Sequence, residues 1–275
     1  MYSRFLSRCL LLFLVLPLCL SAQRQAADSG YFNSFDRTRI YYTSWGAGFP
    51  VVLVHGFIVD GESWKKTALL DSLLAAGFRV VTLDLRGNGR SDKPQEAAAY
   101  ANDAEAKDIM QLANHLQLGN YDAVGYSRGS IIAARLLVLD KRIQKAVMGG
   151  MGTDFTDPEW PRRKMFYRAL AGDTVKELEP MVRYVQSSGL NQRALALLQK
   201  EQPSTPAATL RAVNIPVLVI CGKEDSDNGK ASDLAALFRL GKYVSVPGDH
   251  GTAVRTGAFA GAVTAFLKEK AGRIK

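Results

Sequence analysis

The sequence predicts an α/β fold in which a mainly parallel sheet is covered on both faces by helices. Two observations carry this prediction. Short apolar runs alternate with helical patterns along most of the chain, and several of these runs end in glycine-rich or polar phrases. With 275 residues, of which 47% are hydrophobic, the chain can bury one large core, and α/β proteins of this size are routinely one domain.

The expected elements begin with an antiparallel hairpin, in which residues 31–35 and 40–44 are joined around Asp36. The strands expected after it are short, apolar runs, a pattern typical of strands that are buried on both faces. They are residues 51–54, 79–83, 121–125, 145–148, 217–221 and 243–246. Helical patterns are expected at residues 64–76, 101–116, 130–139 and 232–238.

Residues 154–209 break the alternation, and we expect them to form a small helical lid inserted into the main domain. Helical patterns are expected there at 159–171, 174–187 and 191–201. Large apolar side chains could supply the inner face of the lid, or could pack within it and touch no substrate: Trp160, Met165, Phe166, Tyr167, Met181 and Tyr184. A lid of this length implies a modest pocket, suited to a small or medium acyl group.

The most informative phrase is Gly-Tyr-Ser-Arg-Gly, from Gly125 to Gly129, which follows a predicted strand and opens a helical run. A serine on a sharp turn from strand to helix has its hydroxyl exposed at the sheet edge, where a histidine can take its proton. Composition alone predicts about 0.1 chance matches to this pattern in such a chain. The surrounding sequence must therefore show whether the phrase is a catalytic motif or a chance match.

The context is a set of phrases in a fixed order at the ends of the other predicted strands. They are His55-Gly56-Phe57, the stretch from Asp84 to Pro94, Gly222-Lys223-Glu224-Asp225 and Pro247-Gly248-Asp249-His250-Gly251. Together with the serine phrase they resemble the α/β-hydrolase superfamily. The stretch Arg-Gly-x-Gly-x-Ser-Asp, starting at Arg86, is similar to its esterase, lactonase, haloperoxidase and iminopeptidase branch. The resemblance runs from about Phe32 to Leu267 and implies the α/β-hydrolase fold, with an eight-stranded sheet.

The resemblance also implies roles for particular residues. Ser127 would be the nucleophile, Asp225 the acid and His250 the base, in the chain order that this fold uses. The backbone N–H groups of Phe57 and Arg128 would form the oxyanion hole. This chemistry requires neither a metal ion nor a cofactor.

Other candidate residues have simpler explanations. His55 is expected to shape the loop before Phe57, and His115, within a helical pattern, is expected at the surface or in packing. Asp84 is expected to be structural. Asp227 follows the same strand as Asp225 and is the competing acid, although the family phrase Gly-x-x-Asp selects Asp225.

Four further positions bear on the comparison with the family. Ser91 and Asp92 are expected to cap the segment that follows them. Asn88 stands where the family often has a histidine, and Ser130 stands where it often has a glycine.

The serine nucleophile favours hydrolysis of a small-molecule carboxylic ester or lactone. Cofactor-free perhydrolysis of the haloperoxidase type, carbon-carbon bond hydrolysis, aminopeptidase activity and acyl transfer use the same triad and remain alternatives. Haloalkane dehalogenase and epoxide hydrolase activities are disfavoured, because those enzymes need aspartate at this position. A ligand-binding receptor of the same fold is the alternative that is not an enzyme.

Residues 1–22 predict a secretory signal peptide, which makes residues 23–275 the mature domain. Arg4 and Arg8 precede an apolar stretch at 9–20, and small residues follow it before Gln23. The apolar stretch is too short to span a bilayer comfortably. The protein is therefore expected to be exported, periplasmic or secreted, without a stable membrane anchor after cleavage; an uncleaved anchor is the alternative. Cys221 would then be the sole cysteine, expected to act as a small buried hydrophobe.

The chain is basic, with 35 Lys and Arg against 26 Asp and Glu and a formal net charge of +9. These charges are scattered along the sequence, which disfavours a nucleic-acid-binding protein and favours a role in solubility.

Overall fold

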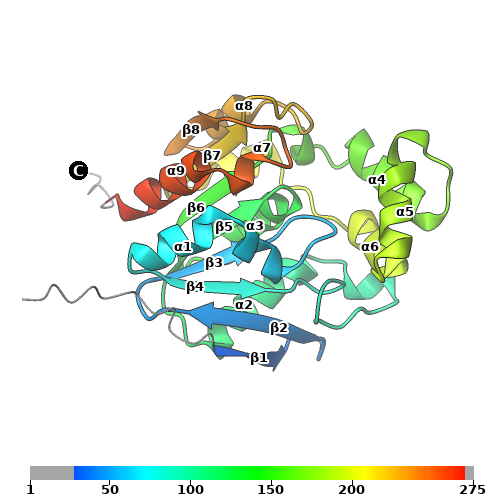
Figure 1. Ribbon diagram of the computed structural model, residues 1–275, viewed down its shortest axis with the longest axis horizontal. Helices are drawn as coiled ribbons and strands as arrows, with labels where there is room; N and C mark the ends of the chain where they lie inside the picture. Colours follow the sequence, from blue (N-terminus) through cyan, green and yellow to red (C-terminus); the bar gives the residue numbers. More distant parts are fainter. Residues whose placement is uncertain (1–27, 270–275) are drawn as a thin grey trace, which may run out of the picture.

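An eight-stranded sheet forms the centre of the computed structural model, which describes residues 28–269 (Figure 1). The strand order is β1-β2-β4-β3-β5-β6-β7-β8. β1 pairs antiparallel with β2 and β2 antiparallel with β4, whereas all other neighbours are parallel, as predicted. The strands are β1 (Asp28–Asn33), β2 (Arg39–Trp45), β3 (Pro50–Val54), β4 (Arg79–Leu83), β5 (Tyr121–Tyr126), β6 (Ile143–Gly149), β7 (Val217–Gly222) and β8 (Gly241–Val246).

Helices cover both faces of this sheet, and each face has its own apolar core. Val51 and Leu53 of β3 pack in one core, whereas Val52 and Val54 pack in the other, because successive strand residues point to opposite faces. This explains why the parallel strands are apolar throughout. The first core is covered by α1 (Ala68–Ala75) and α9 (Gly257–Lys268), and the second by α2 (Ala104–His115), α3 (Arg128–Leu139), α7 (Ala207–Arg211) and α8 (Ala231–Leu237) (Figure 1).

The helix predicted over residues 64–76 is interrupted at Thr67. Residues Gly61–Lys66 form a 3₁₀ turn, and α1 begins only at Ala68. The Thr67 hydroxyl accepts a hydrogen bond from the Leu69 N–H at 3.3 Å, and thus caps α1. The prediction of one continuous helix was therefore wrong, because the side chain of Thr67 competes with the helical backbone.

A lobe of three helices is inserted between β6 and β7. It contains α4 (Pro161–Ala171), α5 (Glu179–Ser187) and α6 (Gln192–Lys200), which Figure 1 shows beside the main body. Residues of α4, α5 and α6, such as Leu170, Val185 and Leu195, form a small core of their own. Leu210 of α7 instead packs in the second core of the sheet, the one that contains Val52 and Val54. Short 3₁₀ turns occur at Ala97–Ala99, Asp154–Thr156, Lys176–Leu178 and Ala253–Arg255.

The loop after β4 is fixed by its polar side chains. Asp84 accepts hydrogen bonds from the Gly61 and Arg90 N–H groups at 2.8 and 2.7 Å, in a structural role. Ser91 accepts from the Tyr41 N–H at 2.9 Å, and Asp92 accepts from the N–H of Arg39 at the same distance. The expectation that Ser91 and Asp92 cap the next segment was therefore wrong, since both side chains bind β2.

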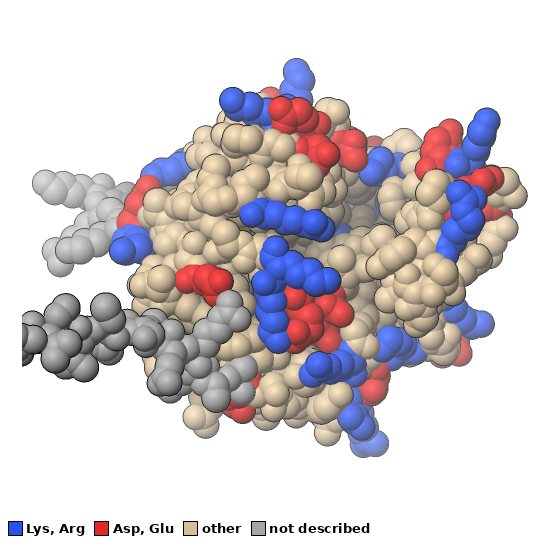
Figure 2. Space-filling view, in the orientation of Figure 1, with Lys and Arg blue, Asp and Glu red and all other residues tan. Residues whose placement is uncertain are grey.

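The expected signal peptide, residues 1–22, lies outside the described residues. Within residues 28–269, no helix has the length and apolarity needed to cross a membrane. Figure 2 shows Lys and Arg spread over the visible face, several of them next to Asp or Glu.

Candidate active site

Ser127 lies on the sharp turn between β5 and α3. Its backbone has φ +54° and ψ −126°, a conformation that residues with a Cβ rarely adopt and that is found at functional sites. The flanking glycines are required by close packing. A Cβ on Gly125 would lie 2.3 Å from the Gly129 carbonyl oxygen, and a Cβ on Gly129 would lie 2.1 Å from that of Val54. The start of α3 thus packs directly on the strands, which leaves the Ser127 side chain at the sheet edge.

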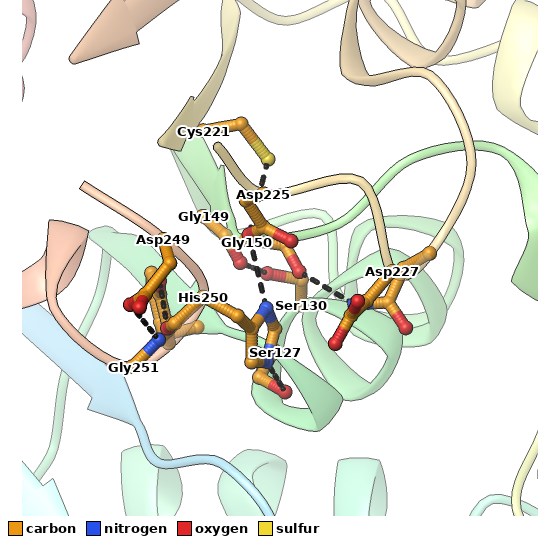
Figure 3. A network of polar contacts seen from close by, with 12 residues as sticks. Ser127, Ser130, Gly149, Gly150, Cys221, Asp225, Asp227, Asp249, His250 and Gly251 are labelled. Atoms are coloured by element: carbon orange, nitrogen blue, oxygen red, sulfur yellow. Dashed lines mark hydrogen bonds and ion pairs between the residues drawn. The ribbon is translucent and has the colours of Figure 1, made fainter. Parts of the chain in front are cut away.

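A chain of hydrogen bonds joins Ser127, His250 and Asp225 (Figure 3). His250 Nε2 lies 2.8 Å from Ser127 Oγ, and His250 Nδ1 lies 2.9 Å from Asp225 Oδ2. Because a carboxylate only accepts, Nδ1 carries the proton of a neutral imidazole and Nε2 is free to accept from the serine hydroxyl. The three residues follow β5, β7 and β8 at the carboxyl ends of these strands, where parallel sheets bind ligands.

The surroundings hold His250 and Asp225 in place. The Asp225 side chain is 1% exposed, whereas that of His250 is 30% exposed and reaches the cavities described below. The Tyr126 hydroxyl donates to the His250 carbonyl oxygen at 2.7 Å. Cys221, expected to act as a small buried hydrophobe, also contacts the acid: its Sγ lies 3.8 Å from Asp225 Oδ2 (Figure 3). Burial raises the pKa of the Cys221 thiol to about 12, so it stays protonated and can donate weakly to that carboxylate.

Asp227, the competing acid, does not contact His250. Its carboxylate is 49% exposed and lies 3.3 Å from the guanidinium of Arg162. Within residues 28–269, the carboxylate that bonds to His250 Nδ1 is that of Asp225, at 2.9 Å. The structure thus brings Asp225 to the histidine, as the family phrase predicts.

The two expected oxyanion-hole donors lie beside Ser127. Phe57 and Arg128 line the same cavity as the serine. Among the described residues, no hydrogen bond takes up the backbone N–H of either one. For Arg128 the reason is that it is the first residue of α3, where helical N–H groups lack an intrahelical acceptor and the helix dipole is positive.

The other two histidines have structural contacts. His55 is buried and accepts from the Leu85 N–H through Nε2 at 3.0 Å, while its Nδ1 lies 2.8 Å from the Gly56 carbonyl oxygen. Burial lowers the pKa of His55, which keeps the ring neutral and able to brace the loop that leads to Phe57. His115 stacks on Phe32, with the ring centroids 5.6 Å apart.

The side chain of Arg128 is a feature that sequence reasoning missed. Its guanidinium binds both carboxylate oxygens of Glu105 at 2.6 Å and donates to the Leu198 carbonyl oxygen at 3.1 Å. The two charged side chains are 4% and 3% exposed. This bidentate pair therefore connects the residue after Ser127 to α2 and to α6 of the lobe. The available signal was a charged residue at the start of a mainly apolar helical run.

Ser130 also stabilises the turn. Its hydroxyl donates to the Gly149 carbonyl oxygen at 2.9 Å, and the same oxygen accepts from the Ser127 N–H at 2.7 Å. The serine that replaces the frequent family glycine thus bonds the start of α3 to the end of β6.

Two cavities of about 290 and 380 Å³ share Ser127, His250 and Phe57. Four of the lid residues expected to face substrate line these cavities. The smaller cavity is lined by Trp160, Phe166 and Met181, and the larger one by Tyr184. Met165 and Tyr167 line neither. Sequence reasoning missed the polar lining of the smaller cavity: Arg162, Arg163, Gln199, Gln202 and Asn228. Within residues 28–269, no cluster of three or more His, Cys, Asp and Glu is placed to hold a metal ion.

Comparisons with known proteins agree with this fold. A Synechocystis protein, provisionally named a non-heme chloroperoxidase, is 44% identical over 111 residues, which are 40% of this chain and 39% of that protein. A non-heme chloroperoxidase from Streptomyces lividans is 34% identical over 123 residues, 43% of each chain. These matches span about two fifths of the curated relatives' length.

Solved structures match over a longer stretch. A bromoperoxidase from Bacillus anthracis has a TM-score of 0.70 and 26% identity, over 88% of this chain and 100% of that one. An esterase from Exiguobacterium antarcticum has a TM-score of 0.72 and 20% identity, over 87% and 99% of the two chains. A family model described as alpha/beta hydrolase fold matches residues 50–200. The chain therefore belongs to the α/β-hydrolase family.

Proposed function

We propose that the protein is a serine hydrolase that cleaves small or medium carboxylic esters or lactones through an acyl-enzyme intermediate. The observation that carries this proposal is the unbroken hydrogen-bond chain from Ser127 through His250 to Asp225, with distances of 2.8 and 2.9 Å. A serine hydroxyl is a weak nucleophile at neutral pH, and a histidine base oriented by a carboxylate activates it.

In this mechanism Ser127 attacks the substrate carbonyl carbon while His250 Nε2 takes the hydroxyl proton. The carbonyl oxygen becomes an oxyanion, which the N–H groups of Phe57 and Arg128 would stabilise; one such donor is typically worth about 3 kcal/mol of barrier. The intermediate then expels the alcohol oxygen, which receives the proton from His250. Water, activated by the same base, attacks the acyl-enzyme and restores Ser127. In a lactone the expelled oxygen remains attached to the acyl group.

Cavity size and the fold neighbours support this substrate class. A cavity of about 290 Å³ lies at the lower end of small-molecule sites and suits a short acyl or alcohol group. Solved proteins of the same fold include the esterase described above and an enol-lactonase from Burkholderia xenovorans, with a TM-score of 0.71 and 21% identity.

Perhydrolysis is the second candidate, because the sequence relatives at 44% and 34% identity carry non-heme chloroperoxidase names. In that reaction hydrogen peroxide, rather than water, attacks the acyl-enzyme and forms a peracid, which can oxidise halide. Halogenation that requires both peroxide and a carboxylic acid or ester would identify this activity.

The test is active-site labelling with an organophosphonate ester, combined with turnover of nitrophenyl acetate. One equivalent of probe should label Ser127, and Ser127→Ala should lose the label and at least about a thousandfold of kcat. Labelling that persists in Ser127→Ala would contradict the proposal. A receptor of this fold would instead release about one equivalent of nitrophenol and then stop.

A further inference from the structure

The smaller cavity beside Ser127 has both polar and apolar lining residues. Arg162, Arg163, Gln199 and Gln202 all line it. None of the described residues that line it is Asp or Glu. The cavity thus presents hydrogen-bond donors and positive charge without an acidic side chain of its own.

Among the described residues, Arg163 is the arginine in this cavity that lacks an acidic partner. Its guanidinium donates to the carbonyl oxygens of Gln202 and Pro158 at 3.0 and 2.7 Å, both of which are neutral. No ion pair within residues 28–269 includes it. By contrast, Arg128 is paired with Glu105 and Arg162 with Asp227. The charge of Arg163 is therefore available to a ligand, while the carbonyl contacts hold its side chain in place.

Two amide side chains in the same cavity are free to bind a ligand. Gln199 and Gln202 are each only 5% exposed, and within the described part of the chain no hydrogen bond involves either side-chain amide. Neither amide is among the fully buried polar atoms that lack a partner, so solvent or a ligand can still reach both. Their NH₂ groups, next to an arginine, offer donors to a ligand that is rich in acceptors.

We propose that this cavity selects esters or lactones that carry a carboxylate, which binds Arg163 and the amide groups of Gln199 and Gln202 while the scissile carbonyl lies at Ser127. The planar guanidinium matches carboxylate geometry, and such charge-assisted hydrogen bonds are stronger than neutral ones. The inference rests on the proposed ester or lactone hydrolysis and names its substrate class.

The test compares substrates of equal size that differ in this charge. For a carboxylate on the acyl part, the pair is nitrophenyl hydrogen adipate and the corresponding methyl ketone. For a carboxylate on the leaving group, it is meta-acetoxybenzoate and meta-acetylphenyl acetate. Wild-type kcat/KM should favour the carboxylate by about tenfold or more in one of the pairs, the scale of a hydrogen bond to a charged group.

Variants then test which residue recognises the charge. Arg163→Gln should reduce the preference to less than about threefold, Arg163→Lys should retain part of it, and Gln199→Met should weaken it. The matched control is Arg168→Gln, on the same helix, because Arg168 is 66% exposed and pairs with Asp173 away from the cavity. This control should keep the full preference. Because each ratio is measured on one protein sample, partial unfolding of a variant cancels from it.

The possible outcomes separate this inference from the proposed function. Hydrolysis of the neutral members without any carboxylate preference would reject the carboxylate site alone. A preference that Arg163→Gln leaves intact would also reject it. If the protein hydrolysed none of the four substrates, both the proposed function and this inference would be rejected.

Discussion

Replacing Asp225 with asparagine should reduce kcat by up to about ten-thousandfold without unfolding the protein. Asp225 Oδ2 accepts the proton of His250 Nδ1 at 2.9 Å, and this fixes Nε2 as the acceptor for Ser127. An asparagine can instead donate its NH₂ group to Nδ1. The ring proton then moves to Nε2, which can no longer take the serine proton. At 1.36 kcal/mol for each factor of ten, the lost stabilisation of the transition state is about 5.4 kcal/mol.

Asp227→Asn is the matched control, because its carboxylate is 49% exposed and, within residues 28–269, forms an ion pair only with Arg162, at 3.3 Å. It should change kcat by less than about tenfold, since exposed ion pairs contribute little. The assay is steady-state hydrolysis of nitrophenyl acetate, with circular dichroism to verify folding. The reverse ranking of the two variants would make Asp227 the acid. If both variants stayed fully active, the hydrogen-bond chain would not be the catalytic one.

Three further predictions concern the substrate, stability and export. Activity on nitrophenyl esters should peak at short acyl chains, since the smaller cavity holds about 290 Å³; a preference for long-chain emulsions would contradict this. Burial raises the pKa of Asp122 to about 7, so the folded state binds a proton that the unfolded state has lost, and this lowers stability as pH rises from about 4 to about 7. In urea unfolding, the free energy of unfolding of Asp122→Asn relative to that of the wild type should therefore increase by up to about 4 kcal/mol between these pH values. A difference between the two proteins that does not change with pH would refute the raised pKa of Asp122. If residues 1–22 are a cleaved export signal, mass spectrometry of envelope protein should find a chain that begins near Gln23, not at Met1.

The sheet and the hydrogen-bonded triad could be predicted from sequence because each depends on local signals. Continuous apolar runs mark strands buried on both faces, and the glycines on either side of Ser127 mark a turn where a Cβ would collide with the backbone. The ends of parallel strands meet at one edge of a sheet. The family resemblance named Asp225 and His250, and this meeting of strand ends explains why both reach the serine.

Contacts between distant segments could not be predicted in the same way. Nothing local to Arg128 indicates that its guanidinium pairs with Glu105, 23 positions earlier, or with the Leu198 carbonyl, 70 positions later. The same limit applies to the smaller cavity. Large apolar residues of the lobe stand out in the sequence, whereas Arg163 and Gln199 look like ordinary surface residues of a polar helix until the lobe is packed against the sheet.

The contact between Arg128 and α6 has a consequence for how this lobe can change in evolution or design. The guanidinium binds a main-chain carbonyl in the last turn of α6, where helical carbonyls lack an intrahelical partner. Any side chain at position 198 presents the same oxygen, so the bond depends on where the helix ends and not on its sequence. Neighbouring side chains such as Gln199 can therefore be exchanged for new substrates while the turn that carries Ser127 keeps its support. A deletion that moved the end of α6 would remove that support even if it spared every residue that lines the cavity.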